Sequence, residues 1–348
     1  MRQWHGGKLK KFFKENKPLV CFICVVFIGV LWALGYLDHL AERPFDDFKW
    51  PPYVDVMEQV NLELSKKPSA VTPVNDWKKL TPYKVPSCSV DASGTNNLIL
   101  IIVKSAVFNV QHRRAIRDTW GAVKKYSGYV IQTIFLTGRL KPADEKHFGS
   151  VIEMESEKYG DLLIGDFIDY YHNNTYKFLY AIKHAMNYCN RTESVPFTLL
   201  LDDDYIVSIP NLIKEVSRWH PSDRLYTGWR FDVTPFRSRI FKHRVSLSIY
   251  PYDKYPPYIT GGSILLTAQT VTEMYLAAQY VRLYKLDDIY ASILAYLLHI
   301  PALHNENMHF YYYSINGINF KDMICIHGYY GDNLRETYRR LEKRGLMV

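Results

Sequence analysis

The chain has 348 residues, of which 48% are apolar and 22% are charged, with 18 Gly and 17 Pro. This composition excludes a disordered chain, a collagen-like repeat and a small disulfide scaffold. The net charge is +8, but the first 17 residues alone hold six Lys or Arg against one Glu. Because most of the excess charge lies in this tail, a nucleic-acid partner is disfavoured.

An uncharged run of nineteen residues, 19–37, follows the basic tail. A helix of this length spans the apolar core of a bilayer. Five Lys residues precede the run whereas Asp and Glu follow it, so the positive-inside rule keeps residues 1–17 in the cytosol. The alternative is a cleaved signal peptide, but the run is longer than a usual signal core and no A-x-A site ends it. The sequence predicts a single-pass type II protein with a transmembrane helix over 18–37.

The part of the chain beyond the apolar run has features of a lumenal protein. Two N-glycosylation triplets begin at Asn173 and Asn190, as expected of a glycosylated surface. Three cysteines also lie in this part, Cys88, Cys189 and Cys325. An oxidising lumen permits one disulfide among them with one thiol left over, and the sequence does not choose the pair.

Residues 38–95 contain seven prolines among many polar residues, which predicts a stem between the membrane and a body over 96–348. In this body, short apolar runs alternate with helical stretches. The expected strands cover 98–103, 130–136, 161–167 and 197–201, and the expected helices cover 113–120, 144–157 and 175–188. Strands alternating with helices predict an α/β fold with a mostly parallel central sheet flanked by helices.

The sharpest local pattern is a run of three carboxylates, Asp202, Asp203 and Asp204, directly after an apolar strand. In open α/β sheets, ligands bind at the carboxyl ends of the strands. Adjacent carboxylates raise one another's pKa unless a cation neutralises them. Hard oxygen ligands and a phosphate-bearing substrate suit Mn²⁺ or Mg²⁺. The alternative interpretation is an acidic turn that caps the following helix.

Two further patterns could contribute charged groups to a site. The acidic pair Asp287 and Asp288 opens a helical pattern over 289–299, and it is either a helix cap or the position of a general base. Arg113 and Arg117 lie one helical turn apart. They could present a joint face to phosphate or form a solvated helix face.

The order of the motifs resembles the β-1,3-glycosyltransferases of family 31. The segments RRAIRDTWG, IFLTG, EKYGDLLIGDFIDYYHNNTYK, LLLDDDYIV, YPPYITGG, LDDIY and ICIHG follow one another within about residues 98–340. Residues 226–229 and 255–260 look most like the Brainiac branch, which elongates glycolipids with N-acetylglucosamine. The resemblance implies a GT-A type nucleotide-sugar-binding fold, a UDP-sugar donor, Mn²⁺ and inversion at the anomeric carbon. It also implies a Golgi membrane protein whose catalytic domain is lumenal.

The resemblance assigns roles to the acidic residues. Asp204 and His327 are expected to hold the metal ion, with Asp202 and Asp203 helping to hold the ribose and the diphosphate. Asp288 is expected to be the catalytic base that acts on the 3-hydroxyl of a glycolipid or glycoprotein glycan. On the same resemblance, arginines of the first motif frame the nucleotide pocket.

The binding site for the UDP-sugar donor is expected to include Arg113, Arg117, Gly261 and Gly262. The paired glycines end an aromatic and proline-rich segment, where backbone can approach a ligand closely. This stretch, 259–264, departs from the family's usual Cys-Ser-Gly-x-Gly-Tyr.

A second departure is an Asp in place of the Glu that usually precedes the base. The sugar therefore stays open: N-acetylglucosamine is favoured, galactose is next and N-acetylgalactosamine is third. The alternative to an enzyme is a catalytically impaired, membrane-anchored glycan-binding or chaperone protein of the same fold.

Overall fold

The computed structural model describes residues 16–348 apart from 77–78, 89–96, 191–193, 242 and 315–319. The chain divides into two compact units. The N-terminal unit comprises the residues up to 49 together with 232–255. The main unit comprises 50–231 and 256–348.

The N-terminal unit contains the apolar helix predicted from the sequence. Helix α2 (Lys17–Leu34) has a mean hydropathy of 2.4 and none of it is buried, and it is long and apolar enough to cross a membrane. It ends at Gly35, whose φ of 85° is left-handed and terminates the helix. The short helices α3 (Tyr36–His39) and η1 (Phe45–Asp47) follow.

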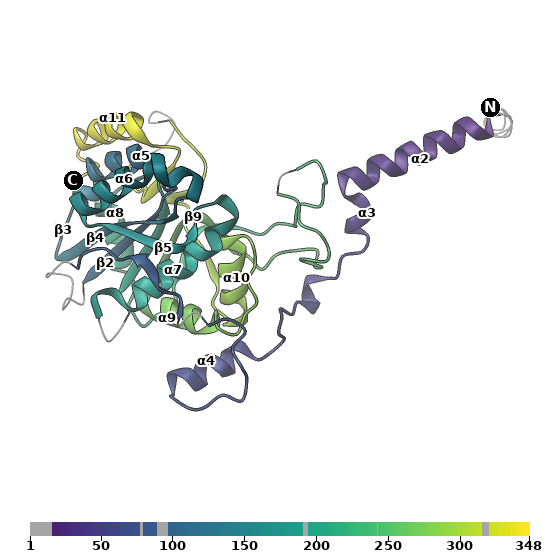
Figure 1. The fold of residues 1–348 in the computed structure, drawn as a ribbon, viewed down its shortest axis with the longest axis horizontal. Helices are drawn as coiled ribbons and strands as arrows, with labels where there is room; N and C mark the ends of the chain where they lie inside the picture. Colours follow the sequence, from purple (N-terminus) through teal and green to yellow (C-terminus); the bar gives the residue numbers. More distant parts are fainter. Residues whose placement is uncertain (1–15, 77–78, 89–96, 191–193, 242, 315–319) are drawn as a thin grey trace. The chain divides into compact units, whose positions relative to one another are not determined.

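The main unit is built on one large mixed sheet with the strand order β1-β5-β4-β2-β6-β9-β8-β10 (Figure 1). Strands β5, β4, β2 and β6 are parallel to one another, whereas β9 is antiparallel to both β6 and β8. The predicted mostly parallel α/β sheet is confirmed. The strands of this path are β1 (Pro82–Lys84), β2 (Leu98–Lys104), β4 (Tyr129–Arg139), β5 (Leu162–Ile168), β6 (Phe197–Asp202), β8 (Tyr226–Phe231), β9 (Tyr258–Thr267) and β10 (Ala302–His304), with β3 (Lys125–Tyr126) paired beside β4.

Strand β2 is the centre of this sheet. All seven of its residues are buried, as expected of a continuous apolar run covered on both faces. Its side chains alternate, and Ile99, Ile101 and Val103 join one contiguous apolar cluster. Burying side chains of this size stabilises the fold by about 1.5–3 kcal/mol each.

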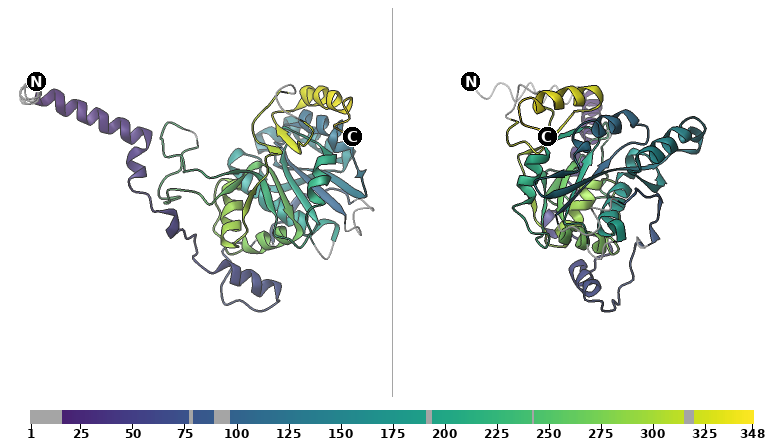
Figure 2. Two further views of the ribbon diagram at one scale, coloured as in Figure 1. Left: turned by 180° about the vertical axis from the view of Figure 1, so that it is seen from behind. Right: turned by 90° about the vertical axis from the view of Figure 1, so that its left-hand side faces the viewer.

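Helices cover both faces of the sheet (Figures 1 and 2). Helices α5, α6, α8 and α11 contribute to the cluster that contains Ile99, whereas α7, α9 and α10 pack together on the opposite face. Their bounds are α5 (Val110–Arg117), α6 (Pro142–Tyr159), α7 (Asn174–Met186), α8 (Ile209–Val216), α9 (Ala268–Ala277), α10 (Asp287–Leu297) and α11 (Gly331–Glu342).

The helix ends follow from local chemistry. Helix α6 has Pro142 at its start, Asp144 and Glu145 in its first turn, and Gly160 with a φ of 62° at its end. Proline lacks the N–H that a first turn leaves unpaired, acids favour the positive end of the helix dipole, and glycine adopts the left-handed cap.

A second, small sheet follows the acidic run directly. Strand β7 (Tyr205–Val207) pairs antiparallel with β12 (Cys325–His327), and β12 pairs with β11 (Met308–His309). In this register His327 lies opposite Tyr205. The small sheet therefore brings a residue near the end of the chain beside the acidic triplet.

The predicted stem over 38–95 is wrong for residues 50–88, which belong to the main unit, and residues 89–95 lie outside the described ranges. Helix α4 (Val56–Leu64) begins at Asp55, whose side chain accepts a hydrogen bond from the Glu58 backbone, and it packs against α9. Strand β1 extends the sheet antiparallel to β5. Proline is tolerated at the start of an edge strand, so a proline-rich segment can still join the body. The helix is too short to give a clear periodic pattern.

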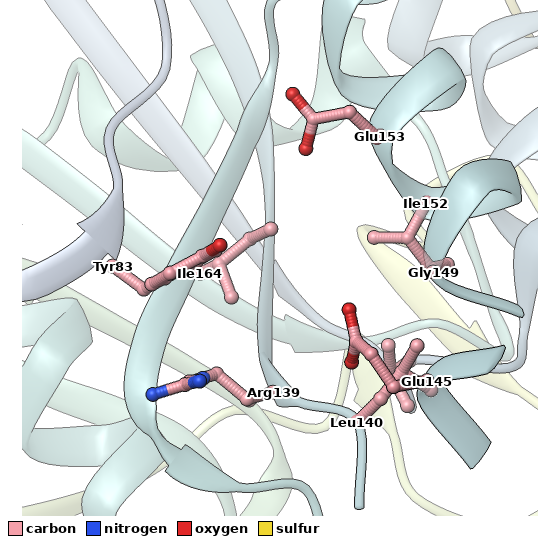
Figure 3. Close-up of a pocket in the computed structure, with 10 residues that line it drawn as sticks. Tyr83, Arg139, Leu140, Glu145, Gly149, Ile152, Glu153 and Ile164 are labelled. Carbon is pink, nitrogen blue, oxygen red and sulfur yellow. The ribbon is translucent and has the colours of Figure 1, made fainter. Parts of the chain in front are cut away.

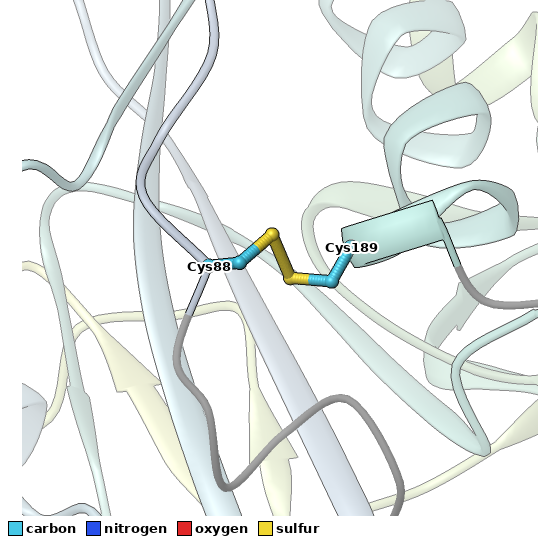
Figure 4. The surroundings of a disulfide bond; sticks show 2 residues. All are labelled: Cys88 and Cys189. Carbon is cyan, nitrogen blue, oxygen red and sulfur yellow. A yellow bond between two sulfur atoms is a disulfide. The ribbon is translucent and has the colours of Figure 1, made fainter.

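The structure settles which cysteines pair. Cys88 and Cys189 form a disulfide with a Cα–Cα distance of 5.6 Å (Figure 4). Cys325 is a buried free thiol in β12. The disulfide links the end of the segment after β1 to the segment after α7.

We expect Cys189→Ser to lower the free energy of unfolding by about 2–4 kcal/mol, because the bond links residues 101 positions apart and restricts the unfolded chain. Thermal and urea unfolding of the variant, followed by circular dichroism, measures the change. The control is Cys24→Ser, which replaces an exposed free thiol. Equal stability of the wild type and Cys189→Ser would contradict the assigned pair.

Candidate functional site

The site residues lie where the order of the parallel strands reverses. From β2 the chain continues to β4 and β5 on one side, and it then returns to β6 on the other side of β2. Such a reversal leaves a crevice at the carboxyl ends of the strands, where open α/β sheets bind ligands. Lys104 ends β2 and Asp202 ends β6, and the two are partners in the strand register.

Lys104 joins two acidic residues at this crevice. Its ammonium group lies 2.8 Å from Asp287 Oδ2 and 3.1 Å from Asp202 Oδ1, and its side chain is 6% exposed. Burial alone would lower the pKa of Lys104, but the two carboxylates raise it well above its usual value. Lys104 therefore stays charged, and it connects β2, β6 and the start of α10.

Asp203 faces the N-terminal end of α5. Its carboxylate accepts hydrogen bonds from Ser105 Oγ at 2.6 Å and Asn109 Nδ2 at 3.0 Å, and it lies 3.1 Å from His112 Nδ1. Burial alone would raise the pKa of Asp203, but these partners lower it below its usual value. Asp203 is therefore held as an anion by the protein's own side chains.

Asp204 faces the small sheet. Its Oδ2 lies 3.1 Å from His327 Nε2, and its backbone carbonyl accepts hydrogen bonds from the amides of Gly328 and Tyr329, each at 2.8 Å. Its Oδ1 is buried and has no hydrogen-bond partner in the described part of the chain. A buried carboxylate oxygen without a partner is costly unless a ligand satisfies it.

The chemistry of Asp204 and His327 would fit a divalent cation that takes its other ligands from a substrate. Within the described ranges, no three His, Cys, Asp or Glu side chains are arranged to hold a metal ion by themselves. Mg²⁺-type sites commonly use one or two protein groups and take further oxygens from substrate phosphates. A carboxylate with an unsatisfied oxygen next to an imidazole matches that pattern.

Asp288 begins α10 beside Asp287. Its Oδ1 accepts a hydrogen bond from the Ile289 amide at 2.8 Å. Burial, followed by repulsion from Asp287, raises the pKa of Asp288 to about 7, although Lys104 opposes the shift. A carboxylate with a near-neutral pKa can accept a proton at physiological pH. The adjacent acids therefore differ: Asp287 is paired with Lys104, and Asp288 is suited to proton transfer.

The two predicted arginines are engaged with the protein itself. Arg113 is fully buried, and its five N–H groups all donate, to Glu155, to Ser105 Oγ and to two backbone carbonyls. Arg117 bridges Glu155 and Asp161. All donors of Arg113 have protein partners in this structure, and its predicted place in the binding site for the UDP-sugar donor stays a prediction. Arg113 positions Ser105, which in turn binds Asp203.

The paired glycines lie in β9, and neither has a left-handed φ. A Cβ on Gly262 would lie 2.3 Å from Tyr205 Oη, and one on Gly261 would lie 3.2 Å from Asp287 Oδ2. The space beside these glycines, which was predicted for a ligand, is therefore occupied by the side chains of Tyr205 and Asp287. At Gly262 a larger residue would displace Tyr205.

The first glycosylation triplet is partly engaged in the folded chain. Asn173 Nδ2 donates to the Ile168 carbonyl at 2.8 Å, and Thr175 is buried with its hydroxyl bonded to the Tyr284 carbonyl. The triplet that starts at Asn190 extends into residues outside the described ranges. Glycosylation at both positions stays a prediction.

Lys104, Ser105, Asn109 and His112 were not predicted from the sequence. The available signal for Lys104 was a charged residue at the end of a continuous apolar strand, the same signal that identified Asp202. The other three residues become visible only when the loop after β2 is placed beside Asp203.

A separate pocket lies between β1, the ends of β4 and β5, and α6 (Figure 3). Its lining includes Tyr83, Arg139, Glu145 and Glu153. It contains none of the predicted site residues, so it is not the site described above.

We expect Lys104→Met to lower the free energy of unfolding by about 3 kcal/mol at neutral pH, because Asp202 and Asp287 would lose their shared counter-charge. The loss should shrink as the pH falls below about 6, because burial raises the pKa of Asp202 to about 6 and protonation removes its unpaired charge. Urea unfolding at several pH values measures this. The control is Lys214→Met, which breaks an exposed pair and should change stability little. A loss that is independent of pH would contradict the assigned role.

Comparisons with known proteins identify the family of the chain. A family model described as Galactosyltransferase matches residues 111–306. The chain is 35% identical over 333 residues to the beta-1,3-galactosyltransferase bre-5 of Caenorhabditis elegans, covering 95% of this chain and 96% of that protein. It is 29% identical over 325 residues to the beta-1,3-galactosyltransferase brn of Drosophila melanogaster, covering 92% of this chain and 94% of that protein.

A vertebrate relative and a solved structure are also similar. The chain is 30% identical over 245 residues to UDP-GalNAc:beta-1,3-N-acetylgalactosaminyltransferase 1 of Homo sapiens, covering 69% of this chain and 72% of that protein. The structure of the galactosyltransferase LgtC with donor and acceptor sugar analogs matches 72% of this chain and 100% of that chain, at 12% identity and a TM-score of 0.34. The family match covers more than half of the chain, and bre-5 aligns with nearly all of it. The resemblance inferred from the motifs is therefore confirmed: the chain belongs to the galactosyltransferase family and is a β-1,3-glycosyltransferase.

Proposed function

We propose that this protein transfers a sugar from a UDP-sugar to the 3-hydroxyl of a glycolipid or glycoprotein glycan, with inversion at the anomeric carbon. The proposal rests on the different environments of Asp204 and Asp288. Asp204 and His327 form a pair with a free carboxylate oxygen, and Asp288 has a pKa near neutrality. A glycan-binding protein needs no such base.

Asp204 and His327 would hold Mn²⁺ together with the donor diphosphate. Bound there, the ion would offset the negative charge that develops on the leaving UDP. The ring of Phe310 stacks on His327 with centroids 6.1 Å apart. His327 is paired with Tyr205 in the small sheet, and the Asp204 carbonyl accepts hydrogen bonds from the amides of Gly328 and Tyr329. These contacts would hold both side chains in place for the ion.

Asp288 acts on the acceptor. It takes the proton from the 3-hydroxyl as that oxygen forms a bond to C1 of the donor sugar. The bond from C1 to the diphosphate oxygen breaks with its electron pair, which leaves on UDP. Attack opposite the leaving group converts an α-linked donor into a β-linked product in one displacement, so no covalent nucleophile is needed.

The donor sugar is open to direct test. N-acetylglucosamine remains the first candidate, because the motifs at 226–229 and 255–260 resemble the Brainiac branch. The names of the relatives make galactose and N-acetylgalactosamine the other two candidates. These donors differ at the 2-substituent and the 4-hydroxyl, and a few pocket contacts discriminate such groups.

We also propose that α2 anchors the protein in the Golgi membrane as a type II protein. The helix is apolar throughout and exposed, and a basic tail precedes it. The flanking charges favour a lumenal main unit, and the disulfide fits an oxidising compartment.

The decisive experiment supplies the full-length protein in detergent with Mn²⁺ and each of the three UDP-sugars, using β-mannoside and β-galactoside acceptors. We expect transfer from one donor, and we expect EDTA to abolish it. Asp288→Asn should lower kcat by about 10²–10⁴-fold while UDP binding is retained.

The matched control for Asp288→Asn is Asp166→Asn at an exposed surface pair, which should keep wild-type transfer. Full activity of Asp288→Asn would refute the assigned base. If the wild type binds UDP with Mn²⁺ but transfers no sugar, the glycan-binding alternative replaces the enzyme.

The pH dependence of transfer follows from the environment of Asp288. Only the deprotonated carboxyl accepts a proton, so kcat/KM should fall on the acidic side with a midpoint near pH 7. Asp287→Asn removes the adjacent negative charge while the positive charge of Lys104 remains. Both effects favour the ionised form of Asp288 and so lower its pKa. The midpoint should then move down by about one pH unit.

Rate profiles for the wild type, Asp287→Asn and the surface control Asp166→Asn test this expectation. Asp166 is paired with Arg139, and its side chain is 56% exposed, so its replacement should leave the midpoint in place. A midpoint that Asp287→Asn does not move, or moves upward, would contradict the assigned coupling.

A further inference from the structure

The loop 232–255, which joins β8 to β9, is bonded to the end of α2 within the N-terminal unit. The amide of Arg239 donates to the Ala33 carbonyl at 2.9 Å, and its guanidinium donates to the Trp32 carbonyl. The same guanidinium lies 4.2 Å from the centroid of the Trp32 ring. Carbonyls at the end of a helix lack the usual partner within the helix. Here the Ala33 carbonyl accepts from the loop, and the Trp32 carbonyl accepts from both the loop and the Gly35 amide.

The backbone contact between the loop and the helix is close. A Cβ on Gly35 would lie 2.5 Å from the backbone carbon of Arg237. Arg237 is itself buried, and it donates to Glu42 Oε1 at 2.6 Å and to the carbonyls of Val245 and Tyr252. A buried guanidinium with these partners ties the loop to the segment directly after α2.

This anchored loop exposes large apolar side chains. Phe236, Ile240 and Phe241 are 58%, 70% and 58% exposed. Ile249 of the same loop is 48% exposed. An exposed group of this kind marks an interaction surface, and aromatic and aliphatic side chains beside cationic ones are typical of segments at a membrane interface.

We infer that Phe236, Ile240 and Phe241 insert into the headgroup and acyl boundary of the bilayer that α2 spans. This inference rests on the proposed membrane anchor. The occupant is the bilayer itself, because the loop is bonded to the last residues of the spanning helix and so lies at the depth where that helix leaves the membrane. The loop is continuous with β9, which carries Gly261 beside Asp287. A loop inserted in the bilayer would keep the protein at the surface where lipid-linked acceptors lie, so it would favour those acceptors.

The insertion is tested with the full chain in phosphatidylcholine vesicles. Cys21→Ala and Cys24→Ala remove the exposed thiols of α2, and an environment-sensitive fluorophore is attached through Ile240→Cys. We expect a blue-shifted emission and quenching by lipids that carry a nitroxide near the headgroup. The matched control is Met154→Cys on α6, which is 59% exposed in the main unit and should be quenched only by aqueous iodide.

A probe at Val26→Cys in the middle of α2 separates this inference from the anchor. Quenching at Val26 by nitroxides deep in the acyl chains, together with an Ile240 probe that behaves like Met154, would refute loop insertion and leave the anchor standing. If neither probe is quenched by lipid, both proposals fail. Gly35→Val should weaken quenching at Ile240 and leave Val26 unchanged, because the new side chain forces the loop away from α2.

An activity measurement tests the acceptor class. A combined Phe236→Ser, Ile240→Ser and Phe241→Ser variant should lose about tenfold in transfer to a glycolipid in the same vesicle, and it should keep wild-type transfer to a soluble glycoside. Equal losses with both acceptors, or no loss with the glycolipid, would overturn the preference for lipid-linked acceptors. If the wild type transfers no sugar, the proposed enzyme fails, while the fluorescence result still decides the insertion.

Discussion

The buried ammonium group of Lys104 is the interaction on which the site depends. It ends the central strand, and its charge is the counter-charge for Asp202 on one neighbouring strand and Asp287 at the start of α10. Carboxylates brought together at one sheet edge repel one another. The lysine offsets this repulsion for two of them and leaves Asp288 without an ion-pair partner among the described residues. The ammonium group of Lys104 thereby gives the adjacent acids Asp287 and Asp288 different environments.

The three consecutive aspartates illustrate how a short motif can serve several elements. Successive side chains at the end of a strand point in different directions. Asp202 meets β2, Asp203 meets the start of α5, and Asp204 meets β12. The motif is therefore a junction between two sheets and a helix, and among the described residues only its last member has a buried carboxylate oxygen without a hydrogen-bond partner.

The central sheet and the positions of Asp202, Asp204 and Asp288 could be predicted from the sequence, because apolar runs followed by charges mark strand ends and helix starts. Contacts between residues that lie far apart in the chain could not be predicted. Nothing local shows that Arg113 is saturated by Glu155, or that residues 50–88 join the body. Those outcomes depend on tertiary pairing. The place of His327 in the candidate site was indicated only by the family resemblance.

The free thiol of Cys325 has a consequence for biosynthesis. It lies in β12, two residues before His327 and opposite Val207, and in the folded chain it is shielded from solvent. In a chain that has not yet folded, this thiol could form a disulfide with Cys88 or Cys189. A mispaired bond would hold β12 away from β7, and so would separate His327 from Asp204. Correct pairing of Cys88 with Cys189 is therefore a condition for bringing His327 beside Asp204.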